Sequence, residues 1–393
     1  MPVINRIAAF HEDMIAWRQE IHRNPETAFE EHRTAEFVAG RLAGFGIEVH
    51  RGLAGTGVVA TLRAGQGQRA IALRADLDAL HIQEKNTLPY ASCVPGKMHA
   101  CGHDGHTAML LGAAKYLAET KRFDGVVHFV FQPAEENEGG GRVMVEQGLF
   151  EQFPCEAVYG MHNLPGMPMG EFAIRPGPMM ASYDIFEIAV EGRGSHGAMP
   201  HQSIDPVVVA AQIVLGLQTI VSRNVKPVDA AVVSVTQIHG GDTWNVIPET
   251  VVLRGTTRCF RRELRDLMER RIGEIAAGIA SAMGATATLR YERRYPPLVN
   301  EDEAVRRALA AALDVAGDPL RVCGEIEPVM GSEDFAFMLE RKPGAYIMIG
   351  NGGGEGGRNL HNPRYDFNDA ILPIGASYWA RLVETSLAKP AAA

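Results

Sequence analysis

The sequence predicts an α/β fold with a mostly parallel sheet flanked by helices, and a smaller inserted α+β layer. Short, uniformly apolar runs alternate with helical patterns in the first and last parts of the chain, as buried parallel strands and their covering helices do. Between these parts the strands instead alternate apolar and polar residues, which is typical of sheets with one wet face. The length of 393 residues also exceeds the roughly 250–300 residues over which one core keeps growing, so two domains are expected.

The first part of the chain begins with helices and continues as strands around one long helix. Residues 4–45 read as two helices split by Asn24-Pro25, with Ile4, Ile7, Phe10 and Met14 on one face. Residues 107–119 carry apolar side chains at helical spacing. The strands expected around this helix cover residues 58–62, 71–74, 126–131 and 158–161.

The inserted layer starts near residue 184 and has a β-α-β-β-α-β order of elements, which is typical of a ferredoxin-like layer. Its expected strands cover residues 184–190, 230–238 and 250–260, and its helices cover 206–221 and 263–283. The α/β pattern then resumes, with a buried strand at 345–349. The expected domains are therefore a first part at 1–183, an insertion at 184–296 and a second part at 297–393.

Composition limits the partners that this chain can have. Its 38 basic and 47 acidic residues give a formal charge of −9, which argues against nucleic acid or an anionic membrane surface as partners. No window approaches the ~20 uninterrupted apolar residues of a membrane-spanning helix. Five cysteines without any CxxC pair, and an N-terminus charged too early for a signal peptide, favour a reducing cytoplasm. Most of the thiols are expected to fill the core.

The loop before the long helix concentrates metal-ligating side chains. Residues 98–106, MHACGHDGH, hold three imidazoles, a thiol and a carboxylate within a loop broken by glycines. These side chains share no packing role, and their common property is metal ligation. The alternative is a solvated loop in front of a helix, which a single histidine would have favoured.

Two adjacent carboxylates, Glu135 and Glu136, follow the buried strand VVHFVF. Open α/β sheets place their ligands at this carboxyl end of the strands. Neighbouring residues point in different directions, so one carboxylate can bind a metal while the other acts as a general base. The alternative is a helix N-terminus that uses acidic residues to meet its dipole.

His162 and His361 each follow another predicted strand of the same sheet. Either histidine alone is more often structural than a ligand, and their weight comes from this shared position. The five donors are Cys101, His103, Glu136, His162 and His361. Five donors are more than one closed tetrahedral site uses, and they suit two ions that share a bridging water.

The inserted layer carries a second, weaker group of candidates, in the strings GRGSHGAMPH and NVIP. His196, Asn245 and Arg258 could orient a carbonyl and bind a carboxylate. An arginine on a strand, such as Arg258, is also typical of an ordinary surface position.

Together these strings resemble the dinuclear metallo-aminoacylase and carboxypeptidase family. The similarity is to its amidohydrolase branch of hippurate hydrolases, auxin-conjugate hydrolases and N-acyl-amino-acid deacylases. It spans about residues 12 to 385, and it rests on the strings RQEIHRNPE, RADLDAL, MHACGHDGHTA, PAEE, GRGSHGAMPH and NVIP in that order.

The resemblance implies that Cys101, His103, Glu136, His162 and His361 are ligands of two divalent ions and that Glu135 is the general base. It implies that His196 touches the scissile carbonyl, usually from the partner subunit of a homodimer, and that Asn245 and Arg258 contact substrate. Relatives outside this branch ligate metal through a His-x-Asp motif, where this chain has Arg74 and Asp76. Asp76 and Asp78 are then expected behind the ligands, supporting them.

The expected activity is hydrolysis of the amide bond in N-acyl amino acids, such as hippurate-like or N-acetyl substrates, by metal-activated water. The metal is open among Zn, Mn, Co and Ni, although the thiol of Cys101 favours a soft ion. An exopeptidase of the same family, acting on dipeptides or a C-terminal residue, is the first alternative. A non-catalytic metal-dependent binding protein and a thiol hydrolase with Cys101 as nucleophile are more distant ones. The inserted layer is expected to act as lid and dimerisation domain.

Overall fold

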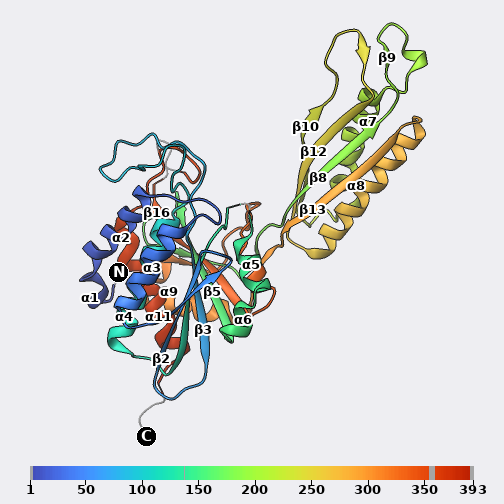
Figure 1. The fold of residues 1–393 in the computed structure, drawn as a ribbon. Coiled ribbons are helices and arrows are strands. Elements are labelled where there is room, and N and C mark those ends of the chain that lie inside the picture. The colour runs from blue at the N-terminus through green and yellow to red at the C-terminus, as the bar shows by residue number, and fades with distance from the viewer. Residues whose placement is uncertain (1–2, 137, 354–358, 390–393) are drawn as a thin grey trace. The chain divides into compact units, whose positions relative to one another are not determined.

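The structure is a computed structural model, and it describes residues 3–136, 138–353 and 359–389. The chain divides into two compact units, each with its own sheet (Figure 1). Unit 1 comprises Met1–Gly177, Val299–Glu327 and Asp334–Ala393. Unit 2 comprises Pro178–Leu298 and Pro328–Glu333, so it interrupts unit 1 twice along the sequence.

Unit 1 is built on an eight-stranded sheet with the order β1-β2-β4-β3-β5-β16-β6-β15. The neighbouring strands β4, β3, β5 and β16 run parallel, whereas β1 and β2 pair antiparallel at one side. The strands are β1 (Glu48–Leu53), β2 (Gly57–Ala64), β3 (Ala70–Asp76), β4 (Gly125–Gln132), β5 (Ala157–Pro165), β6 (Phe172–Ala173), β15 (Val322–Cys323) and β16 (Gly344–Gly352). The predicted mostly parallel sheet is confirmed, and the five expected strands at 58–62, 71–74, 126–131, 158–161 and 345–349 fall within β2, β3, β4, β5 and β16.

Helices cover this sheet, with α5 and α6 on the side opposite α3 and α4 (Figure 1). The helices are α1 (Asn5–Ala8), α2 (His11–Arg23), α3 (His32–Gly44), α4 (His103–Thr120), α5 (Gly140–Glu146), α6 (Leu149–Gln152), α9 (Asp302–Ala316), α10 (Ala336–Leu339) and α11 (Leu372–Ser386). The central helix α4 packs on β3 and between α2 and α11. Glycine allows this close approach, because a Cβ on Gly112 would lie 2.3 Å from Met14 Sδ and one on Gly375 would lie 2.0 Å from Met109 Sδ. The start of α4 is therefore fixed by packing on several sides.

Some local expectations need correction. Asn24-Pro25 does end α2, but the chain also breaks at Ala9 and Phe10, so residues 4–45 form three helices and not two. The thiols of Cys155 and Cys259 are buried as expected, whereas Cys93 and Cys323 are exposed and do not fill the core. An exposed position accepts a small side chain without any packing requirement.

Unit 2 is a four-stranded antiparallel sheet with the order β10-β12-β8-β13, and α7 and α8 lie along one face of it (Figure 1). Its elements are β8 (Tyr183–Glu191), α7 (Pro206–Thr219), β10 (Ala231–His239), β12 (Thr250–Cys259), α8 (Arg262–Ala282) and β13 (Thr286–Tyr295). Two short ladders pair β9 (Ser195–His196) with β11 (Val246–Ile247), and β7 (Gly177–Met180) with β14 (Leu298–Asn300). Alternate residues of β8, such as Ile188 and Val190, are buried in a core with Ile213 and Ile272 of the helices. The predicted β-α-β-β-α-β order is present.

The helix expected at 206–221 is α7, which ends at Thr219 and continues as a π-helical turn over Ile220–Asn224. Within the described ranges, only this helical stretch, Pro206–Asn224, is long and apolar enough to cross a membrane. One such helix is weak evidence for a membrane protein. Val209, Ile213 and Leu217 bury one side of α7 in the core of unit 2, while Leu215 on its other side is 65% exposed.

Candidate metal centre

The candidate site lies in unit 1, where the parallel strands β3, β4 and β5 end. Asp76 is the last residue of β3, Gln132 is the last residue of β4, and His162 lies inside β5 near its end. The backbone N–H of Leu77 donates to the carbonyl of Gln132 over 2.8 Å and holds the first two strand ends together. This is the edge at which open α/β sheets carry their ligands.

A tight loop brings Cys101 and His103 to this edge. Gly102 adopts a left-handed φ of 101° before α4 begins at His103. A Cβ at Gly102 would lie 2.3 Å from Asn163 Oδ1, so the loop requires glycine for both its conformation and its space. The carbonyl of Ala100 accepts the N–H of His361 at 2.7 Å, which ties the distant C-terminal histidine to the same loop.

The structure brings together all five side chains that the sequence singled out as metal donors. The ligand atoms of Cys101, His103 and His162 all lie within 4.8 Å of one another, and so do those of Cys101, Glu136 and His361. The two groups of three share Cys101. His361 is the most accessible member, with its side chain 54% exposed, and its Nε2 lies 3.1 Å from Glu136 Oε1.

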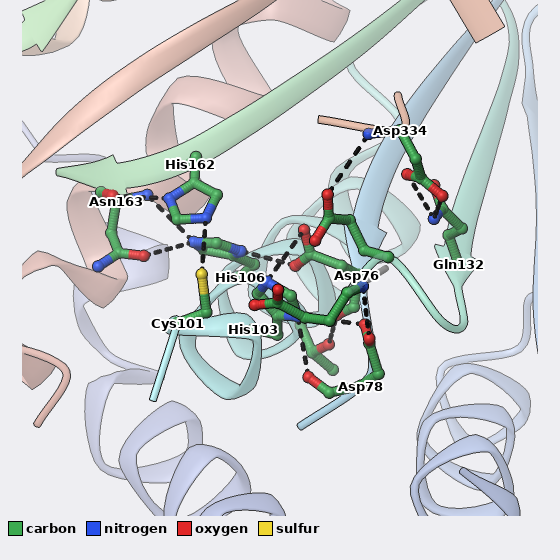
Figure 2. Close-up of polar contacts among 12 residues, drawn as sticks. Asp76, Asp78, Cys101, His103, His106, Gln132, His162, Asn163 and Asp334 are labelled. Atoms are coloured by element: carbon green, nitrogen blue, oxygen red, sulfur yellow. Dashed lines mark hydrogen bonds and ion pairs between the residues drawn. The ribbon is translucent and has the colours of Figure 1, made fainter. Parts of the chain in front are cut away.

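Hydrogen bonds fix which nitrogen of each buried histidine faces the centre. His162 Nδ1–H donates to the carbonyl of Asn163 over 2.7 Å, and its Nε2 faces Cys101 Sγ at 3.3 Å (Figure 2). His103 Nδ1–H donates to the carbonyl of Asp78 over 2.8 Å, with Asp78 Oδ1 at 3.2 Å. The buried Nε2 of His103 has no hydrogen-bond partner in the described part of the chain. Metal-bound histidines show this arrangement, with one nitrogen donating to a fixed acceptor and the other turned to the ion.

The electrostatics of this pocket suit a cation. Burial and the carboxylates of Glu136, Glu135 and Asp76 raise the pKa of the Cys101 thiol well above its usual value. Burial opposes charging of His103, but the carboxylates of Asp76, Asp78 and Glu136 outweigh it and raise the pKa of His103 to about 10. Both shifts report a strongly negative pocket. Two divalent ions would offset this charge, and the thiol, imidazole and carboxylate donors fit such ions.

Glu135 lies beside this donor set and is buried. A ligand atom of Glu135 lies within 4.8 Å of those of His103 and Glu136, and its Oε1 accepts the backbone N–H of Asp334 at 3.4 Å. The chain reaches this position through Ala134, whose φ is +53°. The backbone N–H of Glu136 donates to Asp78 Oδ2 over 2.9 Å. The Glu135 carboxylate and the Glu136 backbone thus have different partners, while the roles of ligand and base for these two residues stay a prediction.

Arg74, for which the resemblance implied a departure from other members of the family, is a buried internal cation. Its guanidinium donates to Asp76 Oδ2 over 2.7 Å, to Asp334 Oδ1 over 3.1 Å and to Gln132 Oε1 over 2.8 Å. His106 Nδ1 lies 2.7 Å from Asp76 Oδ1 (Figure 2). Arg74 thus neutralises carboxylates around the donor set.

Several residues of this support were not identified from the sequence. Asp334 accepts from Arg74, Gln132 and the backbone N–H of Gly141, and Glu31 holds the turn that carries Glu135. Both lie among other charged residues, which do not mark them as supports of the donor set. Only the contact between distant segments reveals them.

The remaining candidates belong to unit 2 and are described within it. His196 is exposed on the β9–β11 ladder, and its Nδ1 accepts the N–H of Ala198 at 3.0 Å, so that Nε2 carries the proton in the neutral ring. Asn245 directly precedes β11 of the same ladder, and its carbonyl accepts the N–H of Gly197 at 2.7 Å. Arg258 lines a cavity of about 550 Å³ on the sheet of unit 2.

Arg258 is half-buried beside an aromatic ring and a hydroxyl. Its guanidinium carbon lies 4.2 Å from the ring centroid of Tyr183, and its Nη1 donates to Ser332 Oγ over 3.2 Å. Burial lowers its pKa. Among the described residues, no carboxylate lies within ion-pair distance of this guanidinium. Such a cation is suited to an external carboxylate.

Comparisons with known proteins place these features in context. The model of peptidase family M20/M25/M40 matches residues 72–385. A hippurate hydrolase of Campylobacter jejuni is 43% identical over 93% of this chain and 94% of its own length. An N-acetylcysteine deacetylase of Bacillus subtilis is 38% identical, over 95% of this chain and 97% of its own. The crystal structure of a dinuclear metal-binding peptidase from Bacillus subtilis superposes with a TM-score of 0.85 at 36% identity, covering 97% of this chain and 99% of the other.

Proposed function

The chain belongs to peptidase family M20/M25/M40, and from that premise we propose that it is a metal-dependent amidohydrolase that cleaves the amide bond of N-acyl amino acids. The observation that carries this proposal is the donor set of unit 1. Five side chains form two groups of three that share Cys101, with the carboxylate of Glu135 beside them. The relatives named for hydrolysis of hippurate and N-acetylcysteine support the substrate class.

In this proposal Cys101, His103 and His162 hold one divalent ion, and Cys101, Glu136 and His361 hold the other. Such ions supply a water of lowered pKa and polarise the amide oxygen. Glu135 Oε accepts the proton of the attacking water and returns it to the nitrogen of the leaving amine.

Unit 2 supplies the groups that recognise the substrate. Because Nδ1 of His196 accepts the N–H of Ala198, its Nε2–H is available to donate to the oxygen of the scissile carbonyl. Arg258 binds the α-carboxylate of the amino acid, and Asn245 orients the amide. Unit 2 thus acts as the lid, and its closure excludes water from the reaction.

The test is metal removal followed by reconstitution. Exhaustive chelation should abolish hydrolysis of hippurate and N-acetyl amino acids, and Zn(II), Mn(II), Co(II) or Ni(II) should restore it to different extents. Glu135→Gln should retain both ions while losing turnover. Activity that survives complete metal removal, or near-normal activity of Glu135→Gln, would overturn the mechanism.

An exopeptidase is the second candidate, because the superposed Bacillus subtilis structure is described as a peptidase. The metal chemistry would be the same. Measuring kcat/KM for N-acyl amino acids and for dipeptides in one assay separates the two functions, since only the group on the acyl side differs. The thiol hydrolase alternative requires an activated thiolate, whereas the surroundings of Cys101 raise its pKa.

We further propose that the protein is a cytoplasmic homodimer or dimer-based oligomer formed through unit 2. The outer strand β10 carries the exposed Ile238, and α7 presents Val207, Val208 and Leu215 to solvent. A second copy that covers this apolar face explains why a helix of a water-exposed unit is so apolar. Sedimentation of the wild type and of Leu215→Glu tests the dimer.

Catalysis across the dimer has its own test. Mixing inactive Glu135→Gln and His196→Ala subunits should regain part of the activity if His196 serves the partner's centre. If subunits exchange but activity is not recovered, His196 acts on the metal centre of its own subunit or takes no part in catalysis.

A further inference from the structure

Glu31 is a buried carboxylate at the start of α3 with no part in the mechanism above. It is fully buried, and its backbone carbonyl accepts the N–H of Ala35. Its Oε1 accepts the backbone N–H of Ala134 at 2.9 Å and that of Phe29 at 3.1 Å. Its Oε2 accepts the hydroxyl of Thr56 at 2.6 Å. Three segments of unit 1 therefore meet at one carboxylate.

Both amides that share Glu31 Oε1 belong to residues in the left-handed region. Phe29 has a φ of +60° and Ala134 has a φ of +53°. Side chains with a Cβ rarely adopt this conformation, so it persists only where neighbouring contacts enforce it. Glu31 provides such a contact at both residues.

The turn at Ala134 determines where the two catalytic-site carboxylates point. Its carbonyl accepts the N–H of Gly140 at 2.8 Å, and the N–H of Glu136 donates to Asp78 Oδ2 at 2.9 Å. A Cβ at Gly140 would lie 1.8 Å from the carbonyl oxygen of Pro133, so this side of the turn cannot move closer. The N–H of Ala134, in the peptide unit between Pro133 and Ala134, donates to Glu31 and anchors the other side of this turn.

We propose that Glu31 is a positioning residue, which holds the left-handed turn at Ala134 and thereby aims Glu135 at the reacting water. This inference rests on the function proposed above. Glu31 acts through the backbone of Ala134, whose N–H donates to its carboxylate.

The positioning of Ala134 depends on the side-chain length that places an acceptor oxygen at its N–H, and not on a negative charge. No ion pair joins Glu31 to a cation within the described ranges. Burial raises its pKa to about 7, although the Thr56 hydroxyl opposes the shift. A neutral amide at this position keeps one oxygen for both N–H groups, and the Thr56 hydroxyl can turn to accept from the amide nitrogen.

Glu31→Asp and Glu31→Gln distinguish the effect of side-chain length from the effect of negative charge. Aspartate keeps the charge but withdraws the oxygens by one methylene, whereas glutamine keeps the length. We expect Glu31→Asp to lower kcat about 10²-fold with KM and metal content nearly unchanged, because a misplacement of ~1 Å costs this much. Glu31→Gln should stay close to the wild type. Glu30→Gln is the matched control, since Glu30 is the exposed neighbour of Glu31, and its carboxylate pairs with Lys97 and accepts from the Thr27 hydroxyl.

Two further measurements distinguish positioning from general destabilisation. In the Glu135→Gln background, Glu31→Asp should lower the residual activity far less than in the wild type, because a group that acts through Glu135 has nothing left to position. Amide hydrogen exchange of the segment 132–136 should accelerate in Glu31→Asp, while the core helix α4 keeps its protection. The exchange measurement does not depend on turnover.

Each outcome decides the proposal. A folded Glu31→Asp variant with wild-type kcat overturns it, and so does an equal loss in both Glu135 backgrounds. A loss in Glu31→Gln as large as that in Glu31→Asp assigns the effect to charge and also overturns it. If the wild type hydrolyses no N-acyl amino acid, the proposed function fails, whereas faster exchange in Glu31→Asp still supports the clamp on Ala134.

Discussion

Asp78→Asn should weaken metal binding without unfolding the protein. The carboxylate of Asp78 connects two donors of different segments, because Oδ1 lies 3.2 Å from His103 Nδ1 and Oδ2 accepts the N–H of Glu136 at 2.9 Å. Asparagine has one acceptor oxygen and one NH₂ group. In either orientation of the amide, its NH₂ group therefore faces an N–H group, either that of His103 Nδ1 or that of the Glu136 backbone.

The expected loss of metal affinity follows from which hydrogen bonds of Asp78 are lost and which are retained. A hydrogen bond to a charged group contributes ~1.5–3 kcal/mol. The carbonyl of Asp78 still accepts from His103 Nδ1 at 2.8 Å, so the tautomer of His103 is retained. One charge-assisted bond is lost, which corresponds to about 10- to 100-fold weaker binding, the range found when outer carboxylates of metal sites are removed.

The assay is competition for Zn(II) between the protein and a chromophoric chelator at fixed free metal. Asp13→Asn is the control, because it removes one negative charge from the exposed surface of α2, where Asp13 pairs with Lys115. Thermal unfolding of the metal-free proteins verifies that the fold is intact. If Asp78→Asn binds both ions with wild-type affinity, the carboxylate does not orient its two donors and the reasoning fails.

Three other predictions concern recognition, the metal loop and pH. Arg258→Ala should lower kcat/KM about 10- to 100-fold for N-acyl amino acids, since a charge-assisted bond is lost. It should leave kcat/KM unaffected for N-acyl amino acid amides, which lack the carboxylate. An equal loss on both substrates contradicts the proposed binding of the carboxylate by Arg258. Gly102→Ala should reduce metal stoichiometry and the melting temperature, because the added Cβ meets Asn163. Gly96→Ala is the control, because Gly96 has a φ of +75° but open space around it, so this variant should show only the cost of backbone strain. Equal losses in the two variants would contradict the steric argument. Burial lowers the pKa of His22, but Asp104 and Glu84 outweigh burial and raise this pKa to about 9. Protonated His22 therefore stabilises the folded state by up to about 3 kcal/mol. This stabilisation is fully present below about pH 6.5 and is lost as the pH rises through 9. Urea unfolding of the wild type and His22→Gln at several pH values measures this, and a stability difference that does not shrink toward high pH would refute it.

The fold was largely predictable because its elements have local causes. Runs such as VVHFVF identify buried strands by composition alone, and the apolar spacing in residues 107–119 identifies α4. The break at Ala9 and Phe10 was not predictable, because the apolar face of Ile7, Phe10 and Met14 continues across it. Packing decides such a break, and the spacing of residues does not record it.

The donor set was also visible in the sequence, since ligands concentrate in short strings at strand ends. The supporting contacts were not visible. Arg74 meets Asp334 across 260 residues of sequence, and Glu31 meets Ala134 across 103. A buried ion pair or a backbone clamp leaves no local pattern, because either partner alone resembles an ordinary charged residue.

The discontinuity of unit 1 has a consequence for synthesis on the ribosome. β5 ends at Pro165, but its parallel neighbour β16 begins at Gly344, after the whole of unit 2 has been translated. At ~5–20 residues per second, the nascent chain waits on the order of ten seconds or more before the sheet can close. Cys101, His103 and His162 precede unit 2 in the chain, whereas His361 follows it. The group of Cys101, His103 and His162 is therefore already synthesised while the sheet is incomplete, but the group of Cys101, Glu136 and His361 is complete only after unit 2 has been translated.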